Sequence, residues 1–324
     1  MDTNAIKGLV NNKPFWTEDQ EEVLRQPYNH LASCPGKNFR TELIRVFNMI
    51  YKLPEDKITV IAKFVEILHT SSLLIDDIED ASQWRRGKKA AHTVYGIPMT
   101  INTANYMYFY AMECLQELAA GTDEVVLNKL LIIFNQEMMN LHRGQGLDIY
   151  WRDEFVVPDE QAYLDMVMNK TGGLFRLTVR IMEVFAPNFS DQKSLVPLSN
   201  LLGILYQIRD DYMNLQDTEM IKNKGYAEDV SEGKMSFPII HGIQFGRAHN
   251  DTLVLDILKQ RTHDDAVKRT LVAYLEDTSG SMKYTRMKIS ELTNLINAEY
   301  LPLDHDDEGI YSILRSIVDR LSAI

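Results

Sequence analysis

Hydrophobic residues recur at helical spacing through most of the chain, and no alternating strand pattern holds for long. Within 39–51, for example, Leu43, Val46 and Phe47 fall on one face of a helix. The segment Glu55–Ile78 is apolar around most of its circumference, which predicts a long buried helix. We therefore expect an all-α fold, a bundle whose long central helices carry polar groups inward.

The same periodicity predicts the other helices. In chain order, the predicted helices span Trp16–Arg25, Phe39–Tyr51, Glu55–Ile78, Thr100–Ala119, Glu124–Tyr150, Pro158–Phe185, Lys193–Leu215, Phe237–Ala248, Val254–Lys259, Asp265–Leu275, Ser281–Asn297 and Gly309–Leu321. Three segments between them, at 27–37, 81–93 and 216–233, are predicted to be loops. There is no composition shift and no linker rich in Gly, Ser or Pro, so we expect residues 1–324 to form a single domain.

Composition narrows the class of protein. The chain has 324 residues, 45% of them hydrophobic, which is ample for a large core, and its formal net charge of −12 argues against nucleic acid as a partner. Cys34 and Cys114 lack metal-ligand spacing and fit reduced intracellular thiols. Residues 1–16 contain no signal-peptide core, and no apolar run approaches the ~20 residues of a membrane span. A cytoplasmic protein without a transmembrane segment is expected.

The first candidate for chemistry is an aspartate cluster at the end of the long buried helix. On a helix, Asp76, Asp80 and Asp77 fall at about 0°, 40° and 100°, so we expect one face to carry all three carboxylates. Like charges this close repel unless a cation lies among them. Mg²⁺ typically joins one or two carboxylates to phosphate oxygens. The alternative is a solvated, charged helix end.

A second cluster repeats the pattern far downstream. Asp210, Asp211 and Asn214 have a similar angular layout, which favours two helices that face each other across metal ions. Arg85 and Arg86 follow the first cluster closely, and arginine offers phosphate oxygens a planar fork of donors. Without the carboxylates beside them, these arginines would read as an ordinary solvated loop.

Three further basic positions are candidate phosphate ligands. Lys37 and Arg40 lie three apart at a predicted helix start, where backbone N–H groups also favour anions. His69 lies seven residues before Asp76, about 20° from it around the helix, although a lone histidine there is commonly a satisfied core residue. Lys170 lies in a helix otherwise rich in apolar residues, and a buried lysine needs an anionic partner.

The ordered set of motifs resembles the trans-prenyl diphosphate synthases, most closely the eukaryotic geranylgeranyl diphosphate synthases. The stretches that carry the resemblance are Gly36–Arg40, Asp76–Asp80 with Arg85–Gly87, Gly144–Asp148, Lys170–Phe175, Gln207–Leu215 and Glu232–Pro238. The resemblance implies an isoprenoid-synthase helical bundle with a central active-site cavity, and a homodimer. It implies two substrates, isopentenyl diphosphate and an allylic diphosphate.

The resemblance also assigns roles to residues. It implies that several Mg²⁺ ions are held by Asp76, Asp80 and Asp210, with Asp77, Asp148, Asp211 and Asp229 in or beside the metal layer. The allylic diphosphate and the carbocation left behind would meet Arg85, Lys170, Thr171, Gln207, Lys224 and Lys234. Isopentenyl diphosphate would bind without metal to Gly36, Lys37, Arg40, His69 and Arg86. Asn214 departs from the pattern, because many members have a third aspartate there.

Product length is expected to depend on residues deeper along the helices. The predicted walls and floor of the chain pocket are Ser71, Ser72, Tyr108, Phe109 and His142. Small residues upstream of the aspartates favour a C20 product, geranylgeranyl diphosphate, made from farnesyl diphosphate. The alternative is a synthase that makes farnesyl diphosphate or a longer-chain prenyl diphosphate.

Two other classes share part of this pattern. A class I terpene cyclase would normally replace the second aspartate pair with an Asn/Ser/Glu-type motif and would lack the basic site at 36–40. A non-catalytic synthase subunit usually loses aspartates or lysines that are present here.

Overall fold

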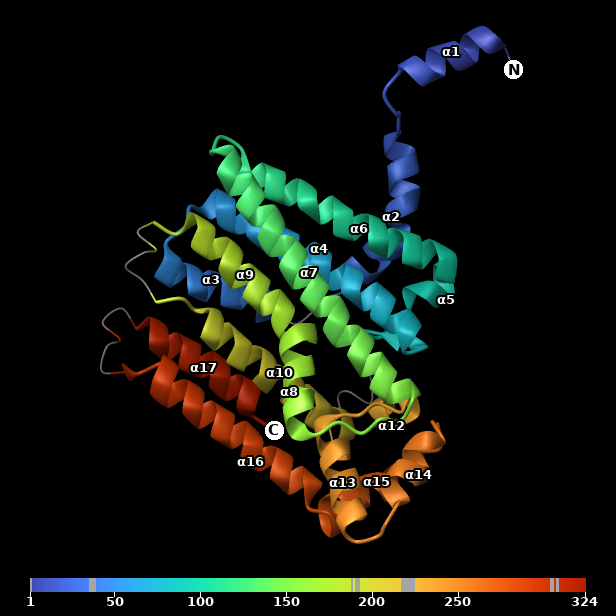
Figure 1. The fold of residues 1–324 in the computed structure, drawn as a ribbon, viewed down its shortest axis with the longest axis vertical. Coiled ribbons are helices and arrows are strands. Elements are labelled where there is room, and N and C mark those ends of the chain that lie inside the picture. The colour runs from blue at the N-terminus through green and yellow to red at the C-terminus, as the bar shows by residue number, and fades with distance from the viewer. Residues whose placement is uncertain are drawn as a thin grey trace.

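The computed structural model describes residues 2–34, 39–187, 189, 193–216, 225–303, 306 and 309–324 of the protein (Figure 1). The α-helices are α1 (Thr3–Asn11), α2 (Glu18–Ala32), α3 (Phe39–Tyr51), α4 (Glu55–Glu79), α5 (Ala91–Tyr95), α6 (Ile97–Ala119), α7 (Glu124–Asp153), α8 (Glu160–Lys170), α9 (Gly172–Phe185), α10 (Val196–Gln216), α12 (Glu228–Glu232), α13 (Phe237–Ala248), α14 (Leu253–Lys259), α15 (Asp265–Ala273), α16 (Ser281–Leu295) and α17 (Ile310–Ser322). Two short π-helices, Tyr274–Thr278 and Ile296–Tyr300, continue α15 and α16. In these ranges the only strands are β1 (Trp84–Arg85) and β2 (Lys88–Lys89), which form one antiparallel hairpin. The predicted all-α class is confirmed.

The long helices form a bundle around α9. This helix packs against α7 and α10, which lie on either side of it, and it also contacts α3 and α4 (Figure 1). α4 packs against α6, α7 packs against α8, and α16 and α17 pack on α10. α13, α14 and α15 form the lower end of the molecule in this view. The segments that carry the candidate motifs, α4, α7, the junction of α8 with α9, and α10, therefore belong to one bundle.

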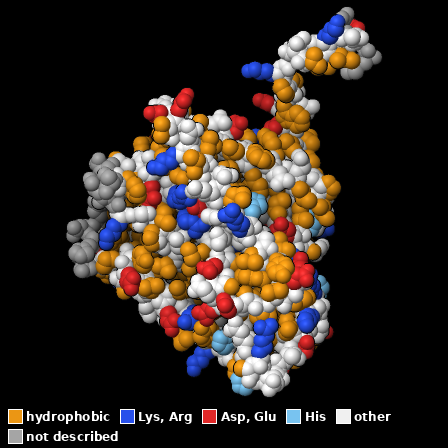
Figure 2. Space-filling view, in the orientation of Figure 1, with side chains coloured by type: hydrophobic (Ala, Val, Ile, Leu, Met, Phe, Trp, Pro, Cys, Tyr) orange, Lys and Arg blue, Asp and Glu red, His pale blue; other side chains and the backbone are white. Residues whose placement is uncertain are grey.

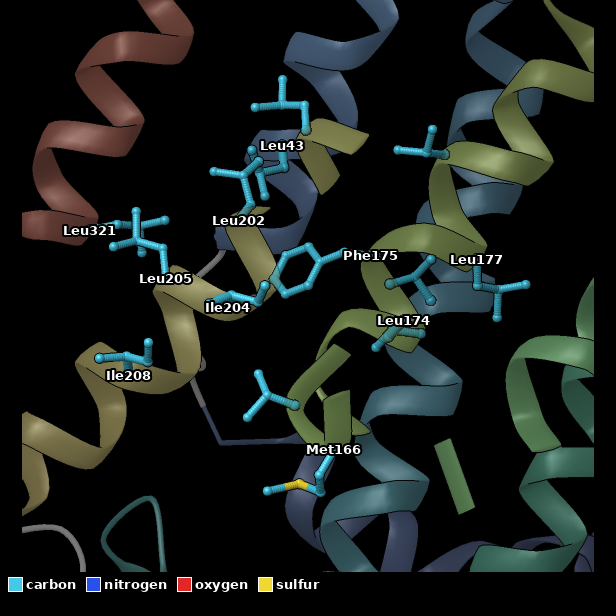
Figure 3. Close-up of a cluster of buried hydrophobic side chains, with 14 of the residues drawn as sticks. Leu43, Met166, Leu174, Phe175, Leu177, Leu202, Ile204, Leu205, Ile208 and Leu321 are labelled. Atoms are coloured by element: carbon cyan, nitrogen blue, oxygen red, sulfur yellow. The ribbon is translucent and has the colours of Figure 1, made fainter. Parts of the chain in front are cut away.

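Apolar side chains fill the space between these helices. Phe175 points from α9 toward Ile204 on α10, and Leu205 faces Leu321 of α17 (Figure 3). All four side chains are buried. The burial of this apolar area supplies most of the driving force for packing the helices.

The N-terminal part differs from prediction in three ways, the first of which is that helix α1 was not predicted. α2 begins at Glu18, with a capping box between Thr17 and Gln20 that satisfies backbone donors at the helix start. It then continues through Pro27 to Ala32, so the predicted loop at 27–37 is wrong as far as Ala32. Proline costs a helix one hydrogen bond, but α2 packs against α4 and α6, and this packing offsets the loss.

The single helix predicted at 158–185 is two helices, α8 and α9, which meet at Thr171. Helix backbones approach this junction very closely on two sides. A Cβ added at Gly144 of α7 would lie 2.8 Å from the Cα of Lys170, and one added at Gly203 of α10 would lie 2.8 Å from the Cα of Gly172. Both glycines are therefore needed for the packing. The predicted loops at 81–93 and 216–233 likewise contain structure, namely the β1–β2 hairpin with α5 and the short helix α12.

One helix in the described part of the chain, α4, is long and apolar enough to cross a membrane by length and composition alone. Half of its most apolar window is buried inside the protein, and its packing on α6 and α9 is that of a core helix. The expectation that no apolar run reaches this length is corrected, because the burial of α4 on several sides selects apolar residues just as a membrane does.

Alanine substitutions in α7 test the close approach of helices at the α8–α9 junction. Gly144→Ala should lower the free energy of unfolding by roughly 1–3 kcal/mol, because the new Cβ meets the rigid backbone of Lys170. Gly146→Ala is the matched control on the same helix, since nothing lies within 4 Å of its Cβ position. The control should be neutral or more stable by up to about 1 kcal/mol. Urea unfolding of both variants measures the difference, and equal stabilities would contradict the packing.

Candidate active site

The three aspartates at the end of α4 lie in two different environments. Asp77 is 1% exposed, whereas Asp76 and Asp80 are only half-buried. Nε of Arg85 donates to Oδ1 of Asp77 at 2.6 Å, and its terminal nitrogen reaches Oδ2 of Asp76 at 2.8 Å. The expectation that all three carboxylates share one face is corrected, because the 100° step between Asp76 and Asp77 turns Asp77 into the interior. Asp77 supports the site by holding Arg85.

The β1–β2 hairpin sends the two adjacent arginines to different places. Its turn consists of Arg86 and Gly87, both with positive φ, as tight hairpin turns require. Arg85 therefore faces the aspartates, while a terminal nitrogen of Arg86 lies 3.3 Å from Nε2 of His69. The structure thus brings together Arg86 and His69, both predicted to bind isopentenyl diphosphate.

Two partners of the first aspartate motif were not predicted. Arg152 donates to Oδ1 of Asp80 at 2.7 Å, and Gln145 donates to Oε2 of Glu79 at 2.7 Å. Arg152 lies four residues after Asp148 on α7, so the two share a helix face. This spacing was the available signal in the sequence.

Lys170 of α8 and Asp148 of α7 form a charged pair that was not predicted. Nζ of Lys170 lies 2.6 Å from Oδ2 of Asp148, while the buried Oδ1 of Asp148 has no hydrogen-bond partner in the described ranges. Burial alone would lower the pKa of Lys170, but the charges of Asp148, Asp76 and Asp80 raise it. The lysine is therefore a permanent cation that faces both α7 and the end of α4.

The junction of α8 with α9 places Thr171 against α10. The Thr171 hydroxyl donates to the amide oxygen of Gln207 at 2.5 Å. The amide nitrogen of Gln207 donates in turn to Oδ1 of Asp211 at 2.8 Å. Thr171 and Gln207, predicted to face the same carbocation, are therefore neighbours.

Asp211 is the centre of a buried hydrogen-bond network and is fully buried. Its Oδ2 accepts from the Tyr163 hydroxyl at 2.6 Å and from the backbone N–H of Phe237 at 2.8 Å. Its Oδ1 accepts from Gln207 and, at 3.1 Å, from Nζ of Lys234. Four donors occupy this carboxylate, which fits the prediction that Asp211 lies beside the metal layer better than one in which it binds metal directly. Asp211 orients Gln207 and Lys234 instead.

Lys234 and Asp229 lie together beside this network. Nζ of Lys234 is 3.6 Å from Oδ1 of Asp229. Burial would lower the pKa of Lys234, but the charges of Asp211 and Asp229 raise it well above its usual range. The side-chain oxygen of Asn214 accepts from the backbone N–H of Asp229 at 3.1 Å, so Asn214 anchors the start of α12. Lys224 lies outside the described residues.

Asp210 lies on α10, and Arg40 of α3 lies over Tyr206 of the same helix α10. Asp210 is half-buried and makes no hydrogen bond or ion pair within the described part of the chain. The Arg40 guanidinium carbon lies 5.9 Å from the ring centroids of both Phe175 and Tyr206, a distance at which cation–π attraction is significant. Its buried Nε has no hydrogen-bond partner among the residues described. Two predicted ligands near Arg40, Gly36 and Lys37, fall outside the described ranges.

His69 is held in its neutral form. Burial and the positive charges of Arg40 and Arg86 lower the pKa of His69 well below its usual range. A neutral imidazole offers one donor and one acceptor nitrogen.

Some of the residues predicted to line the chain pocket are buried in the structure, and others are exposed. Ser71 and Tyr108 are buried, and Ser72 is half-buried. The rings of Tyr108 and His142 are in edge contact, with centroids 5.8 Å apart, but His142 is itself exposed, so its predicted place on the floor is also corrected. Phe109, however, is 71% exposed in the single chain. Its ring points away from the interior, so its predicted place on the floor is corrected, because one residue along a helix turns the side chain by about 100°.

The donor set fits a hard divalent cation, although the described residues contain no group of three His, Cys, Asp or Glu side chains arranged to hold a metal. Asp76, Asp80 and Asp210 supply only carboxylate oxygens, the ligands that Mg²⁺ prefers. The buried Oδ1 of Asp148 without a hydrogen-bond partner is a further oxygen of this kind. In this arrangement Arg85 and the other nearby cations neutralise the carboxylates.

Comparison with known proteins places this geometry in context. The chain matches the family model described as Polyprenyl synthetase over residues 21–275. It is 58% identical over 324 residues to a geranylgeranyl pyrophosphate synthase of Eremothecium gossypii, covering 99% of each chain. It is 49% identical over 297 residues to geranylgeranyl pyrophosphate synthase 1 of Zymoseptoria tritici, covering 90% of this chain and 82% of that protein. The matched range contains both aspartate motifs and the site lysines.

The lowered pKa of His69 predicts a pH-dependent stability. Below the ordinary histidine pKa of 6.5 the unfolded chain binds a proton that folded His69 does not, so stability falls as the pH falls. His69→Gln removes this group. Between about pH 7.5 and pH 5.5 the variant should lose less free energy of unfolding than the wild type, by up to about 1.4 kcal/mol. Urea unfolding at the two pH values measures the difference, and parallel losses would show that His69 is not held neutral.

Proposed function

The chain belongs to the polyprenyl synthetase family, and we propose that it condenses isopentenyl diphosphate with farnesyl diphosphate to give geranylgeranyl diphosphate. The observation that carries this proposal is the separation of two basic groups by the β1–β2 hairpin. Arg85 hydrogen-bonds to the aspartate carboxylates, and Arg86 contacts His69. One reaction with two diphosphate substrates needs both kinds of site, since one diphosphate must leave and the other must stay.

We place the allylic diphosphate beside the carboxylates of the two aspartate motifs. Asp76, Asp80 and Asp210 would hold Mg²⁺, which neutralises charge on the leaving diphosphate when bound. Lys170 and Lys234 contribute fixed positive charge at the same place, because their carboxylate partners keep them protonated. Arg85 is held by Asp76 and Asp77, so it acts by orienting carboxylates as well as by its charge.

Isopentenyl diphosphate is placed at the basic side. Arg40 and Arg86 supply charge, and neutral His69 supplies one more hydrogen bond. The predicted ligands Gly36 and Lys37 precede Arg40 in the chain. Within the described residues Arg86 hydrogen-bonds to the backbone oxygen of Cys34 and to His69 and not to a carboxylate, which suits a diphosphate that has to remain attached to its substrate.

The bond changes then follow from the placement of the substrates. The allylic C–O bond breaks, the diphosphate takes the electron pair, and the double bond of isopentenyl diphosphate attacks the allylic carbon. Loss of a proton from the adjacent carbon, taken up by the released diphosphate, restores a double bond. The oxygens of Thr171 and Gln207 point dipoles at the cation without attacking it, because they are engaged with each other and with Asp211.

We also infer a homodimer with one catalytic domain per chain, in the cytoplasm. Large apolar side chains are exposed along α6 and α7, where they would meet a second copy: Phe109, Val125, Ile132, Met139 and Leu147. Figure 2 shows hydrophobic side chains on the face that α7 crosses. A large hydrophobic cluster includes residues from Leu43 to Leu321, and a smaller one at Leu74 and Ala104 shares helices α4 and α6 with it, which supports one domain. Sedimentation analysis tests the dimer, and a stable monomer at micromolar concentration would overturn it.

Product analysis tests the function. The purified protein, incubated with isopentenyl diphosphate and dimethylallyl, geranyl or farnesyl diphosphate in turn, should give a C20 diphosphate by mass spectrometry, fastest from farnesyl diphosphate. EDTA should abolish turnover and added Mg²⁺ should restore it. Asp76→Ala should lower kcat by roughly two to four orders of magnitude with the fold intact. Cyclic hydrocarbon from farnesyl diphosphate alone, or undiminished activity in EDTA, would refute the proposal.

Arg40→Met tests the division into two diphosphate sites. Its KM for isopentenyl diphosphate should rise by roughly 10- to 100-fold, because a charged hydrogen bond to phosphate is lost. Its KM for farnesyl diphosphate should change far less. Steady-state kinetics with each substrate varied in turn decides the matter, and an equal rise in both constants would contradict the division.

Ser72→Phe tests the wall of the chain pocket. Ser72 lies one helical turn before Asp76, about 6 Å deeper along α4, and is half-buried. A phenyl ring there should shorten the product toward C15, since one turn of helix matches about one isoprene unit. Tyr108→Ala, at the proposed floor beside His142, should lengthen it beyond C20. Mass spectrometry of the products measures both effects, and unchanged chain lengths would exclude this placement.

A further inference from the structure

A buried charge cluster lies on α7 and α9, outside the residues assigned to substrates. Glu137 of α7 is 2% exposed, and its carboxylate accepts from Arg176 at 2.6 Å and from Arg180 at 2.6 Å. Burial would raise the pKa of Glu137, but the two arginines lower it, so the carboxylate stays ionised. Replacing such a cluster with apolar residues is often neutral for stability, so what this cluster does has to be judged from the groups that it holds.

Arg176 does more than neutralise Glu137. One terminal nitrogen donates to the backbone oxygen of Met168 at 3.1 Å and to Oδ1 of Asn200 at 2.9 Å. Met168 lies in the last turn of α8, where helix carbonyls lack intrahelical partners. A single guanidinium on α9 therefore joins α7, α8 and α10.

The element that Arg176 fixes is the junction of α8 with α9. Lys170 and Thr171 follow Met168 by two and three residues, and their side chains reach Asp148 and Gln207. Gly144 and Gly203 allow α7 and α10 to approach this junction, but a glycine forms no directional side-chain bond. Arg176 supplies the directional bonds, because its planar fork has donors aimed at three different partners.

We propose that Arg176, held by Glu137, is a positioning residue that sets the α8–α9 junction and so aims Lys170 and Thr171 at the reacting allylic substrate. This inference rests on the proposed function and deepens it. Arg176 itself touches no substrate group assigned above. A shift of 1 Å in a positioned group can cost about 100-fold in rate. Arg176 is therefore expected to control kcat through its two neighbours in the site.

Arg180 provides a matched control. It also pairs with Glu137, and its second terminal nitrogen donates to Gln136, but its hydrogen bonds do not extend to α8 or α10 within the described residues. Arg176→Lys is the main test variant, because it keeps the positive charge beside Glu137. Arg176 uses Nε and one terminal nitrogen for Glu137 and the other terminal nitrogen for Met168 and Asn200, whereas a lysine has all its donors on one nitrogen and lacks this fork.

The experiment compares steady-state constants for the full-length protein with farnesyl and isopentenyl diphosphates. Arg176→Lys should lower kcat by roughly 10- to 100-fold and leave the KM for isopentenyl diphosphate within about twofold. Arg180→Met should leave kcat within about twofold of wild type. In a Lys170→Ala background, Arg176→Lys should cost at most about threefold more, because its effect passes largely through Lys170.

Three results would overturn the inference: wild-type kcat in Arg176→Lys, an equal loss in Arg180→Met, or full multiplication of the two effects in the Lys170→Ala background. Circular dichroism and the unfolding midpoint of each variant show whether the fold is retained. Failure of the proposed function is separate, since the wild-type protein itself would then form no prenyl diphosphate.

Discussion

The site depends on one constraint, the close packing of the α8–α9 junction between α7 and α10. A Cβ at Gly144 or at Gly203 would meet helix backbone within 2.8 Å, so only glycine permits this approach. The approach ends one helix at Lys170 and turns Thr171 toward Gln207. A continuous helix through 158–185 would carry these side chains in other directions, because each residue turns the helix by about 100°.

Charge pairing then fixes the groups around this junction. Asp76 and Asp77 hold Arg85, Asp148 holds Lys170, and Asp211 with Asp229 holds Lys234. Each pair brings a carboxylate and a cation from different elements to one place, and each cation relieves repulsion among the acids. By contrast, Arg86 lies beside a neutral histidine, and Arg40 lies over two aromatic rings. The cations paired with carboxylates suit a diphosphate that is bound together with metal. Arg40 and Arg86 suit a diphosphate that is bound without metal.

Most of the helices could be predicted from the sequence, because burial on one face imposes a 3.6-residue period that needs no knowledge of the partner helix. The prediction for α3 is correct at both ends, and that for α4 differs by one residue. The helix predictions were wrong where tertiary packing overrides the local conformational preference of the chain. Pro27 lies inside α2 because that helix is packed on two others. The helix break at Thr171 was missed because its cause lies in Gly144 and Gly203, which are distant in sequence.

In the candidate site, too, some features follow from the sequence and others only from tertiary packing. The sequence by itself determined which residue types were available for the chemistry, since the aspartates, arginines and lysines stand in a recognisable order. It could not determine which carboxylate of a motif faces a ligand and which one is buried and hydrogen-bonded to other parts of the fold. The tertiary structure decided that Asp77 and Asp211 are buried and hydrogen-bonded, whereas Asp76 and Asp210 are half-buried. The physical reason is that a buried carboxylate needs donors from other elements, and only the packing of α8, α13 and the hairpin brings those donors into reach.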